Sequence, residues 1–494
     1  MERRLAVIDC GSNSFRLVVF SYTDTWWKRT DEIHESVRVG EGLEGSGALQ
    51  PEPMERALET LELYAHFCAA TGVDEIRPVA TSAIRDASNQ AEFLAAARER
   101  SGLEVEVLPG PAEARYGYLA AVNTTTLSDG VVLDLGGGSM QLTRVVGRDA
   151  VDARSWPLGA VRMTERFAPG KKKKTEALRE HVAAELASAE WLSEGGRLVA
   201  VGGTVRNLAA AAQLAADLPS YGIQGFCVTR EALRDLIETF SSLAPEERGE
   251  VPGIKASRGD LILAGALVID GVMEAGGFDA LEATEAGLRE GVFFERRHPD
   301  GLSSDVRRDA VRNLASQYDT DFAHAEHVAR LALELWDALA AHGLHPGEAA
   351  ERELVWATGM LHDIGVAVDY DDHHKHSRYL ILNAGLPGFS PREAALIGQA
   401  ARYHRKGTPS PGEFSPVLHD GDRAALDRIA ACVRLAEQFE RSRDQSVHDV
   451  EVSVLNGTAE LTLRASGDTR IARWAAERQS DLFERAFGRG LIVR

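Results

Sequence analysis

The pattern of apolar and polar residues repeats one unit twice in the first third of the chain. An apolar run at 5–8 ends in Asp9, passes through a short polar turn and returns to an apolar run at 15–19. A second run at 131–133 ends in Asp134 and is followed by a glycine-rich turn and another apolar run. Short apolar runs joined by such turns predict β-hairpins. The repeat therefore predicts two similar lobes that face each other.

The rest of the first 297 residues alternates between strand and helix patterns. In the first lobe we expect strands at 33–39, 76–80 and 105–108 and a helix at 53–71 with apolar residues at helical spacing. In the second lobe a strand at 198–201 precedes an alanine-rich helix. This alternation predicts two α/β lobes with mixed sheets, at 1–125 and 126–297.

From residue 305 the pattern becomes almost wholly helical. Residues 322–340 and 351–361 are clear amphipathic segments, and they place a helical domain at 305–445. Short strands return at 450–454 and 460–463, and a last helix is expected at 473–487. We therefore predict a small α+β segment at 446–494.

Composition places the chain among soluble globular proteins with several domains. It has 494 residues, of which 44% are hydrophobic and 26% charged. No apolar run approaches the ~18 residues of a transmembrane helix, and the first residues lack a secretory signal, so we expect a cytoplasmic protein without a membrane partner. The four cysteines lie far apart without metal or redox spacing, which predicts reduced thiols.

The net charge of -20 argues against general electrostatic capture of nucleic acid. A polyanionic substrate would be repelled everywhere except at local positive patches. Two such patches are a lysine run at 171–174 and a cluster at 402–406 that contains Arg402, Arg405 and Lys406.

The two predicted hairpin turns carry residues suited to binding phosphate. Glycine lets backbone amides approach an anion closely, and serine hydroxyls donate further hydrogen bonds. Asp9 and Asp134, at the strand ends, are candidate Mg²⁺ ligands. A strand follows each turn, whereas a helix follows the loop of a P-loop or Rossmann motif. We therefore expect a paired phosphate cleft, with binding residues Gly11, Ser12, Asn13, Ser14, Gly136, Gly137, Gly138 and Ser139.

A set of motifs in this order resembles the exopolyphosphatase and guanosine pentaphosphate phosphohydrolase (Ppx/GppA) family. The motifs are Asp9-Cys-Gly-Ser-Asn-Ser14, Ala80-Thr-Ser-Ala-Ile-Arg85-Asp-Ala, Glu113-Ala-Arg115, Asp134-Leu-Gly-Gly-Gly-Ser139 and Gly202-Gly203-Thr204. The family belongs to the actin, Hsp70 and sugar kinase superfamily. The resemblance thus implies two actin-like (ribonuclease H-like) lobes, and it adds Gly202, Gly203 and Thr204 to the phosphate-binding residues.

The resemblance also implies roles for individual residues. Glu113 corresponds to the general base that activates the attacking water, and Asp134 to a Mg²⁺ ligand. Arg85 would hold phosphate oxygens through a bidentate contact. Family members commonly carry Glu at the position of Gln141, and a neutral amide oxygen there would contribute no charge to a metal site. Weaker metal affinity or a shifted ligand set is therefore expected.

A second signature, Met360-Leu-His362-Asp363-Ile-Gly365, is similar to the metal site of the HD phosphohydrolase superfamily. Imidazole and carboxylate ligands suit iron, manganese or another divalent ion. The resemblance implies an HD-like domain in this region, which would either bind a second metal ion or serve as a structural element. In long members of the family such a domain helps to build the homodimer, so a homodimer is expected here. Its candidate ligands are His324, His362, Asp363, His376, His404 and Glu437, the last at a position where the superfamily has Asp.

The resemblance implies an exopolyphosphatase that uses Mg²⁺ and water to release orthophosphate from the end of inorganic polyphosphate. The same chemistry would serve guanosine pentaphosphate, and the motifs do not separate the two substrates. Gln141 and Glu437 leave open a polyphosphate- or nucleotide-binding regulator with weak catalysis. A sugar kinase is disfavoured, because the motifs around Arg85 and Glu113 are typical of the phosphatase branch.

Overall fold

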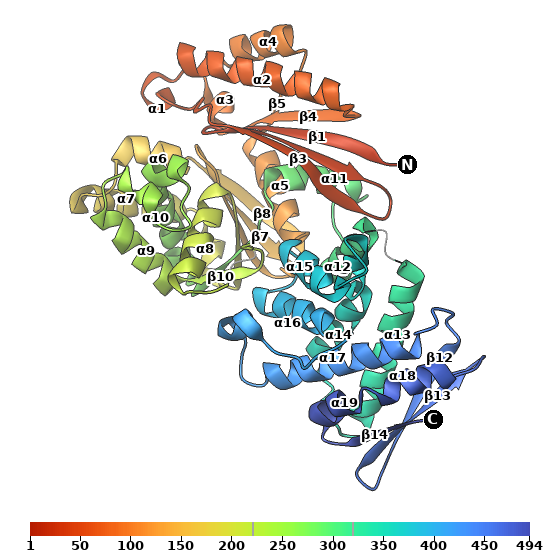
Figure 1. Ribbon diagram of the computed structural model, residues 1–494. Helices are drawn as coiled ribbons and strands as arrows, with labels where there is room; N and C mark the ends of the chain where they lie inside the picture. The colour runs from red at the N-terminus through yellow and green to blue at the C-terminus, as the bar shows by residue number, and fades with distance from the viewer. Residues whose placement is uncertain (220–221, 319–320) are drawn as a thin grey trace. The chain divides into compact units, whose positions relative to one another are not determined.

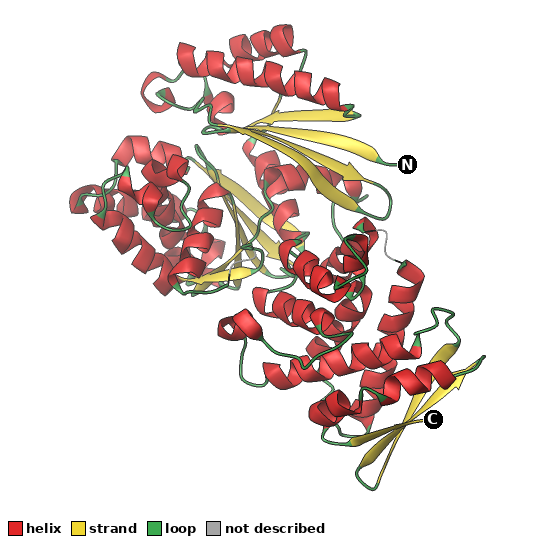
Figure 2. Ribbon diagram, in the orientation of Figure 1, coloured by secondary structure: helices red, strands yellow, loops and turns green. Residues whose placement is uncertain are grey.

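The computed structural model describes residues 1–219, 222–318 and 321–494. The chain separates into two compact units, Met1–Val306 and Arg307–Arg494. The first unit holds both predicted lobes, and the second holds the helical region and the terminal strands (Figure 1; Figure 2). All four cysteines are free, as expected.

The first lobe is a five-stranded sheet in the order β3-β2-β1-β4-β5, with α2 and α4 packed on one face (Figure 1). β1 and β2 form the predicted antiparallel hairpin, and β4 runs parallel to β1. The strand predicted at 33–39 is wrong in its bounds: the strand begins at Trp27 and ends at Glu35. It is an edge strand with mostly exposed polar residues, so it lacks the apolar alternation that reveals inner strands. The elements are β1 (Arg3–Cys10), β2 (Phe15–Tyr22), β3 (Trp27–Glu35), α1 (Leu43–Ser46), α2 (Pro51–Thr71), β4 (Glu75–Ala80), α3 (Ser82–Asp86), α4 (Gln90–Ser101) and β5 (Glu106–Val107).

The second lobe repeats this topology with one added strand. Its sheet reads β8-β7-β6-β9-β11-β10, so the β6–β7 hairpin corresponds to the β1–β2 hairpin and parallel β9 corresponds to β4. The repeat expected from the sequence is confirmed. The elements are β6 (Gly130–Leu135), β7 (Met140–Val146), β8 (Asp149–Trp156), α6 (Ala160–Phe167), α7 (Lys172–Leu186), β9 (Arg197–Val201), α8 (Gly203–Ala215), β10 (Phe226–Thr229), α9 (Arg230–Ser242), α10 (Gly259–Gly276) and β11 (Ala280–Ala283).

Two helices, α5 (Gly110–Val122) and α11 (Leu288–Arg297), connect the lobes through a shared core. This core takes residues from both sheets, among them Val7 and Val132, together with Leu119 of α5 and Phe293 of α11. Phe293 stacks on Phe20 of β2 with ring centroids 4.5 Å apart. The N-terminal end of α5 is thereby fixed between the two sheets, and this end carries Glu113.

The second unit has one hydrophobic core, to which both the helices and the C-terminal strands contribute. The fully buried Trp336 lies in it, as do Leu461 of β13 and Phe483 of α19. The single helix expected at 473–487 is instead two helices, since α18 and α19 each turn a separate short apolar face to that core. The elements are α12 (Val306–Gln317), α13 (Phe322–Ala341), α14 (Ala349–Leu361), α15 (His373–Asn383), α16 (Pro391–Arg402), α17 (Asp422–Phe439), β12 (Val447–Leu455), β13 (Thr458–Ala465), α18 (Arg470–Glu477), α19 (Ser480–Phe487) and β14 (Gly490–Val493).

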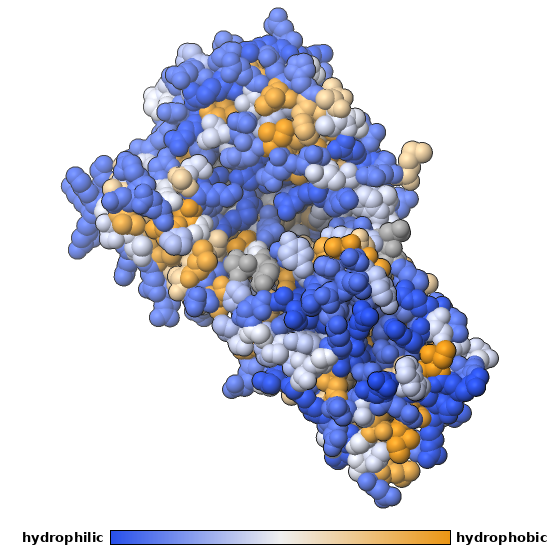
Figure 3. All heavy atoms as spheres, in the orientation of Figure 1, coloured by the Kyte–Doolittle hydropathy of each residue, from blue (hydrophilic) through white to orange (hydrophobic). Residues whose placement is uncertain are grey.

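Polar residues dominate the face of the molecule seen in Figure 3, and apolar residues gather there only in small groups. Among the described residues, no helix combines the length and the apolar character that crossing a bilayer requires.

Candidate active site

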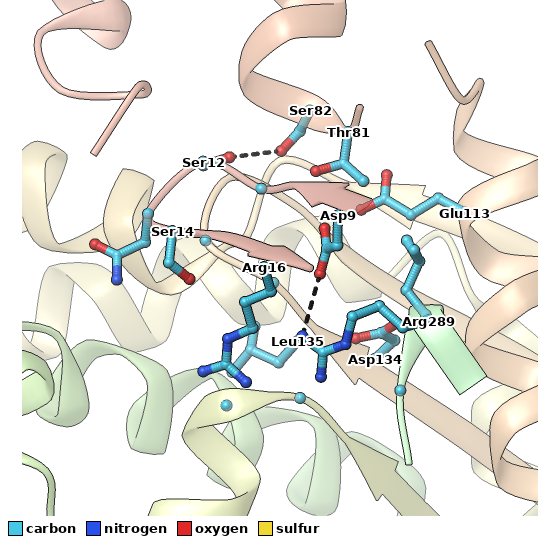
Figure 4. A pocket seen from close by; sticks show the side chains of 18 of the residues that line it. Asp9, Ser12, Ser14, Arg16, Thr81, Ser82, Glu113, Asp134, Leu135 and Arg289 are labelled. Carbon is cyan, nitrogen blue, oxygen red and sulfur yellow. Dashed lines mark hydrogen bonds and ion pairs between the residues drawn. The ribbon is translucent and has the colours of Figure 1, made fainter. Parts of the chain in front are cut away.

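A pocket of about 110 Å³ lies in the first unit where the two hairpin turns meet, and it is called the lobe pocket below (Figure 4). It brings together residues from both lobes and from the start of α5. The predicted site residues that line it are Asp9, Gly11, Ser12, Asn13, Ser14, Glu113, Asp134, Gly136, Gly137, Gly202 and Gly203.

The two turns lie against each other and against the start of α3. Ser12 Oγ lies 3.1 Å from Ser82 Oγ, and a Cβ built on Gly138 would lie 2.4 Å from the same Ser82 oxygen. Only glycine fits at Gly138, because a side chain there would push the two turns apart. Gly138, Ser139 and Thr204, which we expected in the pocket, do not line it; Thr204 packs against Gly265 of α10 instead.

Glu113 lies in the first turn of α5, and its carboxylate faces the lobe pocket. Arg85 Nη1 donates to Glu113 Oε2 at 2.7 Å, and Ser139 Oγ donates to Glu113 Oε1 at 3.3 Å. Burial raises the pKa of Glu113 above its ordinary value, while the hydrogen bond from Arg85 opposes that shift. A carboxylate of raised pKa that is held in one orientation is a stronger base than a solvated one.

Two predicted residues act on Glu113 and do not line the pocket. Arg85 donates both to Glu113 and to the carbonyl of Leu108, the latter at 2.9 Å, so its guanidinium contacts the carboxylate and does not line the pocket. Gln141 Nε2 donates to Ser139 Oγ at 2.9 Å, and this hydroxyl donates onward to Glu113. The hydrogen bond from Arg85 and the series of hydrogen bonds from Gln141 through Ser139 both restrict the rotation of the Glu113 side chain.

Asp9 and Asp134 lie together in the lobe pocket, as the repeat predicted. Burial raises the pKa of Asp9. Burial, followed by the nearby charges of Glu113 and Asp9, raises the pKa of Asp134 to about 7. Crowded carboxylates of this kind lose their mutual repulsion when a cation binds between them.

The residues around Asp134 fit a Mg²⁺ ion. Gln141 lies directly opposite Asp134 across the β6–β7 pair, so both side chains leave the same face of the sheet. The Gln141 Oε1 atom is buried, and no described residue donates a hydrogen bond to it. Two carboxylates and one amide oxygen are the hard oxygen donors that Mg²⁺ prefers, and an open pocket leaves room for the waters it keeps.

Four arginines, called the arginine group below, line the same pocket and were not identified from the sequence. They are Arg16, Arg206, Arg258 and Arg289. Burial, and then repulsion from the other arginines, lowers the pKa of Arg206 to about 10, and burial followed by Arg16 does the same for Arg258, so both remain charged at neutral pH. Arg289 Nη1 lies 3.8 Å from Asp9 Oδ2 (Figure 4), and among the described residues the buried Arg289 Nε has no hydrogen-bond partner. Arg16 and Arg206 each follow one of the glycine turns by only a few residues, and this signal could have revealed these two arginines.

The second unit collects most of the other predicted ligands in one place. His324, His362, Asp363, His404 and Glu437 lie together, and His373 joins them. These six residues are called the histidine cluster below. His376 was expected in this position, but it lies one helical turn beyond His373 and outside both metal-type groups that the described residues form. The exposed lysine run at 171–174 lies outside the lobe pocket.

Comparison with known proteins agrees with this geometry. A model of the Ppx/GppA phosphatase family matches residues 18–299, and a model of Ppx/GppA phosphatase domain III matches residues 306–479. A solved Ppx/GppA family member from Aquifex aeolicus is 28% identical with a TM-score of 0.53, over 61% of this chain and 100% of that chain. An exopolyphosphatase-like protein is 27% identical with a TM-score of 0.55, over 59% and 96%.

An exopolyphosphatase from Cytophaga hutchinsonii shares the fold at 22% identity, with a TM-score of 0.57 over 61% of this chain and 99% of that chain. The expected fold class is confirmed: actin-like lobes precede a mostly helical region. Since the first family model alone covers more than half of the sequence, the chain belongs to the Ppx/GppA phosphatase family and is a phosphoanhydride hydrolase.

Proposed function

We propose that this protein is an exopolyphosphatase, which hydrolyses the terminal phosphoanhydride bond of inorganic polyphosphate and releases orthophosphate. The observation that carries the proposal is the position of Glu113. Its buried carboxylate faces a pocket that also holds two phosphate-type turns and the arginine group. A base and an anion-binding surface therefore share one small space.

The arginine group supplies the attraction for a polyanion. A chain with net charge -20 repels such a substrate in general, and four guanidinium groups in one pocket, one buried and three partly buried, reverse that repulsion locally. Arginine presents a planar fork of donors that matches the oxygens of a phosphoryl group. Backbone amides of the turns at Gly11–Ser14 and Gly136–Gly137 add further donors to the same oxygens.

Glu113 would accept a proton from a water molecule as the water oxygen attacks the terminal phosphorus. The bond from that phosphorus to the bridging oxygen breaks, and the shortened chain leaves with the electron pair. Negative charge on the phosphoryl oxygens is met by the arginine group and by the turn amides. Mg²⁺, held by Asp9 and Asp134 with Gln141 beside them, would neutralise part of the phosphate charge.

The pocket lining favours an inorganic chain over a nucleotide. Among the described residues that line the lobe pocket, none is aromatic, and Leu135 and Leu288 are the apolar members apart from glycine. A guanine base is commonly held by stacking on an aromatic or guanidinium plane. The arginines here lie among carboxylates and turns where phosphates would bind, so successive phosphate groups match the lining better.

The test is a phosphate-release assay on the purified full-length protein with Mg²⁺. Long polyphosphate, short polyphosphate and guanosine pentaphosphate are offered at equal concentrations of terminal phosphate. We expect the highest kcat/KM with polyphosphate and a loss of release when a chelator removes the metal. Release from the nucleotide alone would make the protein a guanosine pentaphosphate phosphohydrolase. Tight binding of polyphosphate without release would make it a regulator.

A further inference from the structure

The two sides of the lobe pocket differ in their chemistry. In Figure 4, Glu113 and the guanidinium group of Arg16 lie on opposite sides of Asp9. On the side of Glu113 the turns are in contact, since a Cβ built on Gly138 would lie 2.4 Å from the hydroxyl oxygen of Ser82. This contact closes the pocket beside the base. A phosphate chain whose terminal group lies at Glu113 is therefore directed past Arg16.

Arg16 is the middle member of a row of three residues that crosses the first sheet. Asp9 of β1 lies directly opposite Arg16 of β2, and Arg16 lies directly opposite His34 of β3. Residues opposite each other in antiparallel strands leave the same face of the sheet. Because Asp9 faces the lobe pocket, His34 lies on that same face, about 10 Å from Asp9 at two strand spacings. His34 is exposed and lies outside the residues that line the pocket.

The second lobe supplies two basic residues near the same place. Arg258 ends the short 3₁₀ helix η3 (Ala256–Arg258), and Lys255 precedes it directly. The Arg258 guanidinium packs against Gly203, where a Cβ would lie 2.8 Å from Arg258 Nη2. The backbone amide of Lys255 donates to Asn207 Oδ1 at 2.7 Å. Both residues are thus held at the start of α8, while the side chain of Lys255 is exposed.

Electrostatics place these groups of the two lobes in one region. Burial, followed by the positive charges of Arg16, Arg258 and Lys255, lowers the pKa of His34 to about 4. The ring is therefore neutral at neutral pH, and one of its nitrogens carries a hydrogen that can be donated to a phosphate oxygen. Arg16 and Arg258 line the lobe pocket, whereas His34 and Lys255 lie just beyond them.

The acidic residues near this region do not cancel its positive charge. Glu32, on the same strand as His34, lies 3.8 Å from Arg16, and its side chain is 44% exposed. Asp260 pairs with Arg38 at 3.3 Å. Arg16, Arg258 and Lys255 therefore leave an excess of positive charge, and their mutual repulsion would be relieved by a bound polyanion.

We propose that His34 and Lys255 form a distal phosphate subsite, at which a polyphosphate chain is bound after it leaves the lobe pocket between Arg16 and Arg258. The inference rests on the proposed exopolyphosphatase function and adds a basis for chain-length preference. A chain that is too short to span about 10 Å from Asp9 does not reach the distal subsite. The kcat/KM should therefore rise with chain length until the distal subsite is filled, and then level off.

The test compares phosphate release from tripolyphosphate and from longer chains of uniform length, at equal concentrations of chains, with Mg²⁺ and the full-length protein. The readout is the ratio of kcat/KM for a long chain to kcat/KM for tripolyphosphate. His34→Glu should lower this ratio ~10-fold, the scale of losing one hydrogen bond to a charged group. Lys255→Gln should lower it ~3-fold, because the lysine is exposed. His34→Lys should raise the ratio, and a merely structural role of His34 would not give opposite effects for the two charges.

Lys28→Gln is the matched control, since Lys28 is an exposed lysine at the other end of β3, and its ratio should equal that of the wild type. A wild-type protein that releases no phosphate from any polyphosphate would refute the proposed function. The same comparison is then made with dissociation constants from calorimetry, so the distal subsite is tested separately. Equal values for tripolyphosphate and long chains in the wild type, or a wild-type ratio in His34→Glu, would overturn the distal subsite.

Discussion

The lobe pocket and the histidine cluster both bring charged and polar side chains together, but they differ in the elements that carry these side chains and in the donor groups they present. The lobe pocket is built from turns at strand ends, and its donors are backbone amides, guanidinium groups and carboxylates that face an open cavity. The histidine cluster is built from helices and the turns beside them, and its donors are imidazoles and carboxylates with almost no exposed surface.

The difference indicates what each region exchanges with its surroundings. An open pocket of hard oxygen ligands and guanidinium groups suits a ligand that enters and leaves, such as a phosphate chain with Mg²⁺. A buried set of nitrogen ligands suits ions that stay bound. The four predictions that follow test the lobe pocket, the region expected to exchange its ligands, and they begin with the largest effect.

Glu113→Gln should lower kcat by ~100-fold or more, since the amide cannot accept the proton of the attacking water. The substitution keeps the size of the side chain, so circular dichroism should match that of the wild type. Glu99→Gln, at an exposed position on α4, is the control and should retain full activity. Phosphate release at the wild-type rate from Glu113→Gln would remove this residue from the mechanism.

Arg206→Gln should raise KM for polyphosphate by ~10-fold or more, because one charge-assisted hydrogen bond contributes about 1.5–3 kcal/mol. The Arg206 guanidinium also donates to the Glu285 carbonyl at 3.2 Å, and a glutamine amide can replace that bond in part. Arg98→Gln removes an exposed arginine as a control. An unchanged KM would show that the arginine group does not contact substrate.

Mg²⁺ affinity should fall about tenfold between pH 8 and pH 6, which is the effect of one competing proton on a group with a pKa near 7. The sign follows from Asp134: burial, with help from Glu113 and Asp9, raises its pKa to about 7, so below this pH the carboxyl is neutral and binds the ion poorly. Calorimetry in buffers of different ionisation enthalpy measures the released proton. A pH-independent affinity would contradict a role for Asp134 as ligand.

Gln141→Glu should raise Mg²⁺ affinity by about fivefold, which corresponds to ~1 kcal/mol. The new carboxylate would lie opposite Asp134, where Gln141 Oε1 has no hydrogen-bond partner in the part of the chain that the structure describes. Gln141→Asn, which withdraws the amide oxygen, should weaken affinity and serves as the matched comparison. Equal affinities for the three proteins, measured by calorimetry at pH 8, would place Gln141 outside the ion's ligands.

The site residues that could be predicted from the sequence are those that belong to a recognisable pattern of neighbouring residues. Asp9 and Asp134 could be predicted because each ends an apolar strand before a glycine turn, and Glu113 because it is the acid of a short motif. Arg289 could not, because it enters the pocket from α11, far along the chain from the turns it faces. The sequence also predicted Arg85 as a site residue, but its hydrogen bond to Glu113 is a feature of the tertiary structure.

In the histidine cluster too, the sequence alone does not identify every member, even among residues that are close together in the chain. Residues 373–376 contain three histidines, and the sequence cannot say which one faces Asp363. Residues three apart on a helix lie on neighbouring but distinct directions, so a choice between His373 and His376 depends on where α15 begins and how closely the turn at Gly365 approaches it.

The order of apolar runs, glycine turns and acidic residues predicted the duplicated lobes, the change to a helical second unit and the two aspartates of the lobe pocket, whereas Glu113 came from a motif of the family that the chain resembles. Each of these depends on neighbours within a few residues, where chain geometry leaves few alternatives. Tertiary structure alone decided that the four arginines meet in one pocket, that Arg85 contacts Glu113 and that His373 joins the histidine cluster. Those contacts join segments separated by tens to hundreds of residues, and packing between elements sets their distances and directions.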